Sequence, residues 1–115
     1  MNYKKEKSFE TRKTEAEKIR SKYPDRIPII VEMQGGSKKV PDIDKKKFLV
    51  PSDLTMGQFQ YVVRKRIKVE PTVSIFMFVN GKIMAGHSVL SQVYEENADE
   101  DKFLYVHYTG ENTFG

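Results

Sequence analysis

The stretch TMGQFQYVVRKRI, residues 55–67, decides the fold because it predicts a long amphipathic helix in the middle of the chain. Thr55 and Gln58 have the spacing of a capping box, in which the hydroxyl and the amide satisfy free N–H groups at the helix start. Basic residues at 64–66 suit the negative end of the helix dipole. Apolar side chains recur at helical spacing at Met56, Phe59, Val62, Val63 and Ile67.

Two apolar runs before this helix predict strands. Residues 27–33, IPIIVEM, are rich in β-branched side chains, and we expect Ile29 and Val31 on one face and Pro28 and Ile30 on the other. Residues 48–50, FLV, follow a lysine run and precede Pro51, which is typical of a protected edge strand. The turn at 34–37 and the polar residues up to 44 predict a loop between the two strands.

The second half of the chain predicts a hairpin, a short helix and a last strand. Residues 75–79, IFMFV, read as a strand, and Asn80-Gly81 is a strong two-residue turn into residues 82–83. Residues 103–108, FLYVHY, form the final strand. Between them, Ser88 is expected to cap a short helix whose inward side chains are Val89, Leu90, Val93 and Tyr94.

The first 26 residues predict a charged helical segment, with nine Lys or Arg against five Asp or Glu. Ala16, Ile19 and Tyr23 recur at i, i+3 and i+7 on a helix over residues 9–22, which Pro24 ends. A shorter helix is expected around residues 4–7. Because the apolar stripe is too thin to form a core alone, we expect this segment to dock on the rest of the chain.

The order of elements is helix, strand, strand, helix, strand, strand, short helix, strand. It predicts an α+β fold, a ubiquitin-like β-grasp with an N-terminal helical extension. The expected divisions are a helical extension at 1–26, the β-grasp domain at 27–108, and a flexible tail at 109–115 that ends in glycine.

Composition narrows the function. The 115 residues fit one domain, with 38% hydrophobic and 31% charged residues and a net charge of +4, well short of a dedicated nucleic-acid binder. We expect no signal peptide and no membrane span. Because cysteine is absent, the chain has no disulfide, thiolate metal site or thiol nucleophile. With no phosphate loop or paired-carboxylate signature either, we expect no enzyme activity, metal or cofactor, and we expect His87 and His107 to be structural or surface residues.

The tail carries the strongest functional signal. Small or polar residues at 109–113 separate the last apolar run from Phe114-Gly115. This is the layout of a ubiquitin-like modifier, whose terminal carboxylate must thread narrow active sites, and glycine lets the backbone approach closely. The alternative is an ordinary disordered tail.

Blocks along the whole chain resemble the autophagy ubiquitin-like modifiers, the GABARAP and microtubule-associated light-chain group, and are nearer the GABARAP branch. The matching blocks are residues 23–28, 44–55, 57–59, 64–67, 78–80, 103–105 and 110–115. Departures are a longer loop at Gly35-Gly36, Phe48 where tyrosine is common, and residues 84–86, Met-Ala-Gly, in place of Pro-Pro-Thr.

The resemblance implies a lipid-linked modifier. An activating (E1-like) and a conjugating (E2-like) enzyme would join Gly115 to phosphatidylethanolamine, and a cysteine protease recognising Phe114 would trim the chain and later release the lipid. Two acyl chains hold a protein firmly on a membrane. The protein would be cytoplasmic, and on the autophagosome membrane when lipidated, where it recruits cargo receptors and adaptors carrying an aromatic-x-x-aliphatic motif.

The resemblance also implies a groove for that motif beside the predicted edge strand, where a peptide can add as a further strand. Leu49 and Val50 must point to opposite faces. The aromatic pocket would be Glu15, Ile19, Pro28, Ile30, Lys47, Leu49 and Phe103. The aliphatic pocket would be Phe48, Val50, Pro51, Leu54, Phe59, Val62 and Val63. Lys45, Lys46 and Arg66 would attract acidic residues that flank the motif.

Plainer interpretations stay open. The apolar pocket residues also fit an ordinary core, and the lysine run also fits a solvated edge. Two other functions are a modifier of protein lysines, and a non-lipidated trafficking or microtubule-associated adaptor whose basic helix binds an acidic partner such as tubulin. The adaptor predicts function that survives loss of Gly115.

Overall fold

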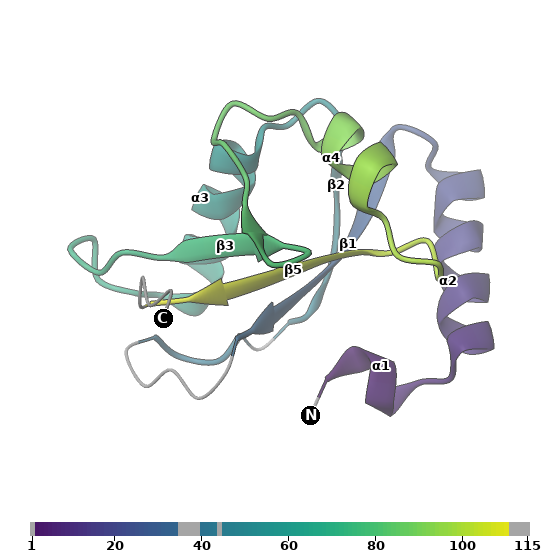
Figure 1. Cartoon of the computed structure of the whole chain (residues 1–115), viewed down its shortest axis with the longest axis horizontal. Coiled ribbons are helices and arrows are strands. Elements are labelled where there is room, and N and C mark those ends of the chain that lie inside the picture. The colour runs from purple at the N-terminus through teal and green to yellow at the C-terminus, as the bar shows by residue number, and fades with distance from the viewer. Residues whose placement is uncertain (1, 35–39, 44, 111–115) are drawn as a thin grey trace.

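A computed structural model of the chain describes residues 2–34, 40–43 and 45–110, and these form one mixed sheet with helices on both of its faces (Figure 1). The five strands lie in the order β2-β1-β5-β3-β4, with β1 and β5 parallel at the centre and the other neighbours antiparallel. The strands are β1 Arg26–Met33, β2 Lys47–Pro51, β3 Phe76–Val79, β4 Lys82–Ile83 and β5 Leu104–Thr109. This is the predicted β-grasp arrangement, and β2 lies at an edge as expected.

The helices are α1 Tyr3–Glu6, α2 Phe9–Lys22, α3 Met56–Ile67 and α4 Leu90–Asn97. The capping box at the start of α3 is present, with Thr55 and Gln58 bonded reciprocally. Asn80 and Gly81 both have positive φ, 51° and 76°, as the predicted hairpin turn requires. Each helix in this described part of the chain is too short or too polar to cross a membrane.

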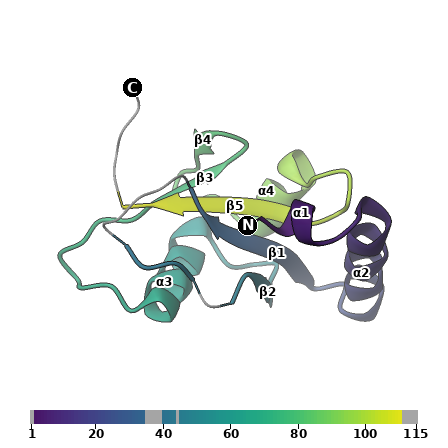
Figure 2. The same ribbon diagram turned by 90° about the horizontal axis from the view of Figure 1, so that it is seen from below.

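Alternation along β1 divides the interior into two clusters. Ile29 and Val31 face a larger apolar cluster that includes α3 and α4, which we call the α3-side cluster. Ile30 faces a smaller cluster with Tyr3, Ala16 and Phe103, which we call the α2-side cluster. Helices α3 and α2 lie well apart in both views, with strands between them (Figures 1 and 2).

The start of α4 differs from the prediction. Its N-cap is Val89, which is 37% exposed, and no side chain caps the helix. The first N–H groups bond instead to backbone carbonyls, that of Leu90 to Leu54 at 2.8 Å and that of Ser91 to Ser52 at 3.0 Å. Because this neighbouring segment already satisfies the orphan donors, Ser88 is not needed as a cap.

The structure adds two details of burial that the spacing and the loop composition did not indicate. Val62 keeps helical spacing but lies on the outer side of α3, where it is 38% exposed. Val40 and Ile43 belong to the segment predicted as a polar loop, yet they are 4% and 5% exposed in the α3-side cluster. The predicted turn at 34–37 falls largely on residues 35–39, which together with residue 44 lie outside the described residues.

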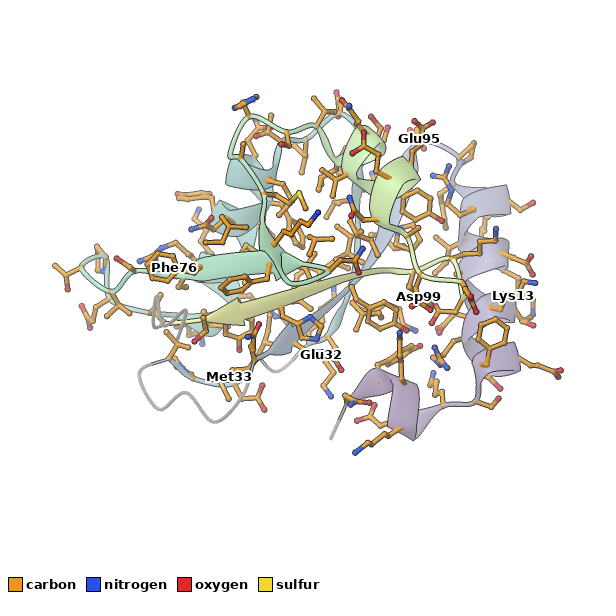
Figure 3. The ribbon with its side chains drawn as sticks, in the orientation of Figure 1. Lys13, Glu32, Met33, Phe76, Glu95 and Asp99 are labelled. Carbon is orange, nitrogen blue, oxygen red and sulfur yellow. The ribbon has the colours of Figure 1, made fainter. Side chains whose placement is uncertain are left out.

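Polar contacts hold α1 and α2 against the sheet. The guanidinium of Arg12 donates to the fully buried Asp101 at 2.5 Å, and the hydroxyl of Tyr105 donates to the same carboxylate. The Tyr3 N–H donates to Glu32 at 2.6 Å, and the Lys4 ammonium pairs with Asp99 at 2.6 Å (Glu32 and Asp99 are labelled in Figure 3). The N-terminal segment is therefore docked by the buried Arg12–Asp101 ion pair, the buried hydrogen bond to Glu32 and the exposed Lys4–Asp99 pair, as well as by its thin apolar stripe.

Candidate peptide-binding site

The edge strand β2 presents its side chains to both clusters in strict alternation. Leu49 and Lys47 lie opposite Pro28 and Ile30 of β1, on the face covered by α2. Phe48 and Val50 lie opposite Ile29 and Ile27, on the face covered by α3. Because the outer edge of β2 borders no further strand of the described sheet, an extended peptide could pair with it and reach both faces.

A surface hollow of about 700 Å³ lies between α2 and the start of β2. Its lining includes the expected Glu15, Ile19 and Lys47, together with Lys7, Glu10, Thr11, Thr14 and Lys18. Leu49 is 38% exposed. Ile30 and Phe103 are fully buried in the α2-side cluster, and Pro28 is buried as well. The residues expected in the aromatic pocket therefore divide into an accessible group, Glu15, Ile19, Lys47 and Leu49, and a buried group, Pro28, Ile30 and Phe103.

The Glu15 carboxylate lies between the Tyr3 hydroxyl and two lysine ammonium groups at this hollow. One carboxylate oxygen accepts a hydrogen bond from the Tyr3 hydroxyl and the other from the Lys47 ammonium, while the Lys7 ammonium lies 3.9 Å away. Partial burial alone would raise the pKa of Glu15, but the bonds from Lys47 and Tyr3 outweigh it and lower that pKa below its ordinary value. Glu15 is therefore a charged carboxylate at neutral pH, with both oxygens engaged.

The residues expected to form the aliphatic pocket are mostly core. Phe48 and Val50 are 6% exposed, and Phe59 and Val63 are fully buried. The rings of Phe48 and Phe59 pack edge to face with centroids 5.8 Å apart. The accessible part of this set is Pro51, Leu54 and Val62, since Pro51 and Val62 are exposed and Leu54 is half-buried. An aliphatic side chain would meet these three first.

The expected charge contacts point in different directions. The Lys45 ammonium lies over the Phe48 ring, 5.3 Å from its centroid, so it is near the groove. Lys46 instead reaches toward α1, where it lies 3.3 Å from Glu6 and 3.9 Å from Glu32. Arg66 is exposed on α3. Lys45 and Lys47 are therefore the lysines of this run that border the groove.

Sequence reasoning missed Tyr3. Its side chain is only 4% exposed, its ring packs edge to face on Phe103 at 5.6 Å, and the Lys47 ammonium lies 5.9 Å from the ring centroid. Burial, and after it the bond to Glu15, raise the pKa of the Tyr3 hydroxyl, which therefore stays a donor. Helix α1 has four residues, too few for a helical period to mark Tyr3 as inward-facing.

Other chemistry has little support within the residues described. Among them, no three His, Cys, Asp or Glu side chains are grouped as a metal site requires. His107 lies 3.6 Å from Glu32, beside the anchored start of α1. Phe114 and Gly115, which the resemblance assigns to protease recognition and conjugation, lie outside the described residues.

Comparison with known proteins gives one consistent answer. The family model "Autophagy protein Atg8 ubiquitin like" matches residues 11–115. "Autophagy-related protein 8" of Mycosarcoma maydis is 60% identical over 113 residues, which cover 98% of this chain and 95% of that protein. "Autophagy-related protein 8d" of Arabidopsis thaliana is 57% identical over 114 residues, covering 99% and 94%. The crystal structure of Trypanosoma brucei ATG8 aligns with a TM-score of 0.91 and 43% identity over 100% of this chain and 98% of that one.

Proposed function

This chain belongs to the Atg8 family of ubiquitin-like autophagy modifiers, and on that premise we propose that Gly115 is its conjugated residue and the β2 groove its receptor site. An activating and a conjugating enzyme join the Gly115 carboxylate to phosphatidylethanolamine, and a cysteine protease that reads Phe114 removes the lipid. The protein moves between the cytoplasm and the autophagosome membrane. The observation that carries the proposal is the family match, which runs through residue 115.

Lipid attachment explains how such a chain reaches a membrane. The described helices offer no span, but phosphatidylethanolamine supplies two acyl chains, which anchor a protein far more firmly than one. ATP adenylates the Gly115 carboxylate with loss of pyrophosphate, an enzyme thiol displaces AMP to give a thioester, and the lipid amine displaces the thiol to form the amide. Cleavage by the protease adds water across the same amide bond and reverses the attachment.

Reconstitution tests this step. Purified activating and conjugating enzymes, ATP and phosphatidylethanolamine liposomes are combined with the chain, and the product is read by intact mass. The wild type should gain one lipid, deletion of Gly115 should give none, and Gly115→Ala should be strongly impaired because the added Cβ crowds the enzyme channels. Gly86→Ala is the matched control, since nothing lies within 4 Å of its added Cβ.

The outcomes separate the alternatives. Lipid on the deletion variant would overturn the assignment of Gly115 as the conjugated residue, and a wild type that gains no lipid would favour the adaptor. Conjugates to protein lysines without any lipid adduct would favour the other class of modifier.

Receptor binding follows from the groove. An aromatic side chain would enter the hollow beside Glu15 and Ile19, and an aliphatic one would meet Pro51, Leu54 and Val62. Two such anchors contribute roughly 1.5–3 kcal/mol each, less the cost of ordering the peptide, which points to affinity on the order of micromolar. A coated membrane raises the effective affinity by multivalency.

Calorimetric titration with the synthetic peptide Glu-Glu-Glu-Trp-Gln-Ser-Leu-Gly tests the groove. Leu49→Ala with Val62→Ala should weaken binding at least tenfold, about 1.4 kcal/mol. Both side chains are 38% exposed, so the fold should survive, whereas the 6% exposed Phe48 is core and unsuitable. Ile83→Ala, 50% exposed on the opposite edge strand, is the control. Unchanged affinity in the double variant would remove this groove from consideration.

A further inference from the structure

Tyr3 contacts the aromatic pocket from behind, although it does not line the hollow itself. Its hydroxyl donates to Glu15, its ring packs on Phe103 at 5.6 Å, and its ring lies 5.9 Å from the Lys47 ammonium. All three neighbours were expected in the pocket, and they come from α2, the segment before β5, and β2. One side chain of α1 therefore joins the three separate parts of the pocket.

The same residue ties α1 to the sheet. The Tyr3 N–H donates to Glu32 of β1 at 2.6 Å, and the flanking Lys4 pairs with Asp99 at 2.6 Å. The position of Tyr3 therefore depends on whether α1 is docked. When α1 is docked, the hydroxyl engages one oxygen of Glu15 and leaves the other for Lys47.

We propose that Tyr3 is a positioning residue for the aromatic pocket, so that docking of α1 and binding of the aromatic-x-x-aliphatic peptide favour each other. Without the Tyr3 hydroxyl, the Glu15 carboxylate loses one of its two close donors and can change rotamer, and Lys47 moves with it. The peptide must then order both side chains as it binds, which lowers its affinity. The inference rests on the groove proposed above.

The coupling must be reciprocal, because two binding equilibria that share a free-energy link affect each other by the same factor. The bound peptide should therefore hold α1 more firmly on the sheet. The amides of residues 5–7 report this directly, since they bond back to Asn2 and Tyr3 within α1. A purely structural role for Tyr3 would leave their exchange rate unchanged by the peptide.

The test uses the full chain and the same tryptophan-containing peptide. Tyr3→Phe keeps the ring and removes only the hydroxyl, and it should weaken binding about three- to tenfold, the cost of ordering one or two long side chains. Tyr61→Phe is the matched control, a tyrosine 60% exposed on α3. In a Glu15→Ala background, Tyr3→Phe should not weaken binding further, because the hydrogen bond through which Tyr3 acts on the pocket is already absent.

Hydrogen exchange supplies the second measurement. Peptide binding should slow exchange at residues 5–7 in the wild type and less so in Tyr3→Phe. Unchanged or tighter binding by Tyr3→Phe overturns the inference, as does an equal loss in the Glu15→Ala background. If the wild type fails to bind the peptide, the groove itself fails; if it binds and Tyr3→Phe matches it, only the present inference fails.

Discussion

The two faces of β1 are covered by interiors of different character. On the α3 side, Ile29 and Val31 pack into a cluster of apolar side chains. On the α2 side, Ile30 shares a much smaller apolar cluster, and the buried charged residues Arg12, Glu32 and Asp101 contribute to the docking. Dispersion and apolar burial are non-directional, whereas charge pairs depend on geometry. We therefore expect the more stable part of the fold on the α3 face and the more easily loosened part on the α2 face.

The largest effect should come from the α3 side. Phe59→Ala removes a fully buried ring that packs on Phe48, and it should lower the free energy of unfolding by about 3–5 kcal/mol. Urea unfolding followed by circular dichroism measures this. A loss below that of the next variant would reverse the proposed division between the faces.

Breaking the charge network on the α2 side should cost somewhat less. Asp101→Ala leaves the Arg12 guanidinium without its carboxylate, and we expect a loss of about 3 kcal/mol. The value falls at the lower end because Arg12 still donates to the carbonyl of Lys7 at 3.1 Å. Exposed Asp53→Ala is the control and should change little. If Asp101→Ala lowers the free energy of unfolding by less than about 1 kcal/mol, the charge network contributes little to stability beyond the apolar contact.

The helix caps allow a matched comparison of the two faces. Thr55 caps α3 and Ser8 caps α2, each accepting a backbone N–H at 3.2 Å. Thr55→Ala should lower global stability by about 1 kcal/mol. Ser8→Ala should lower it by less than half as much and act mainly on local exchange in α2. Equal global losses would show that both helices unfold as one unit.

Acid should loosen the α2 side first, with the smallest effect for any one group. Burial raises the pKa values of Glu15, Glu32 and Asp99, but donors outweigh it and hold all three below their ordinary values of 4.5, 4.5 and 3.8. The groups that lower them, by hydrogen bond or by charge, are Lys47, Tyr3 and Lys7 for Glu15; His107, the Tyr3 amide and Lys46 for Glu32; and Lys4, the Asp101 amide and Arg12 for Asp99.

A lowered folded-state pKa contributes stability above the unfolded value, and that stability is lost as the pH falls through the folded value. Amide exchange in α1 and α2 should therefore rise below about pH 4.5 before that in α3. Salt at about 0.5 M should weaken the difference, because these groups are partly exposed. Simultaneous loss of protection in α2 and α3 would contradict the division.

Local signals predicted much of the fold. The stripe ended by Pro24 marked α2, the Thr55 and Gln58 pair marked the start of α3, and Asn80-Gly81 marked the hairpin. Each of these depends on residues within one or two turns of each other. The two-residue period likewise predicted the opposite facing of Leu49 and Val50.

What the sequence could not show depends on pairs far apart in the chain. Arg12 donates to Asp101, which lies 89 positions later in the chain. Helix α4 needs no side-chain cap because the carbonyls of Leu54 and Ser52 accept from the N–H groups of Leu90 and Ser91. The same holds for the site. Period and resemblance named Lys47 and Glu15, but nothing local joined them to each other or to Tyr3.

The parallel pairing of β1 with β5 has a consequence for synthesis. Residues 29–33 find their central partner only at residues 104–108, so the middle of the sheet stays open until the ribosome has made those residues. Until then β1 and β3 lack the strand that lies between them, and unpaired strand edges invite association with other chains. Such non-local pairing also slows folding. A nascent chain that stops before β5 therefore keeps unpaired strand edges on β1 and β3. It should be a substrate for chaperones and proteases rather than a shorter functional protein.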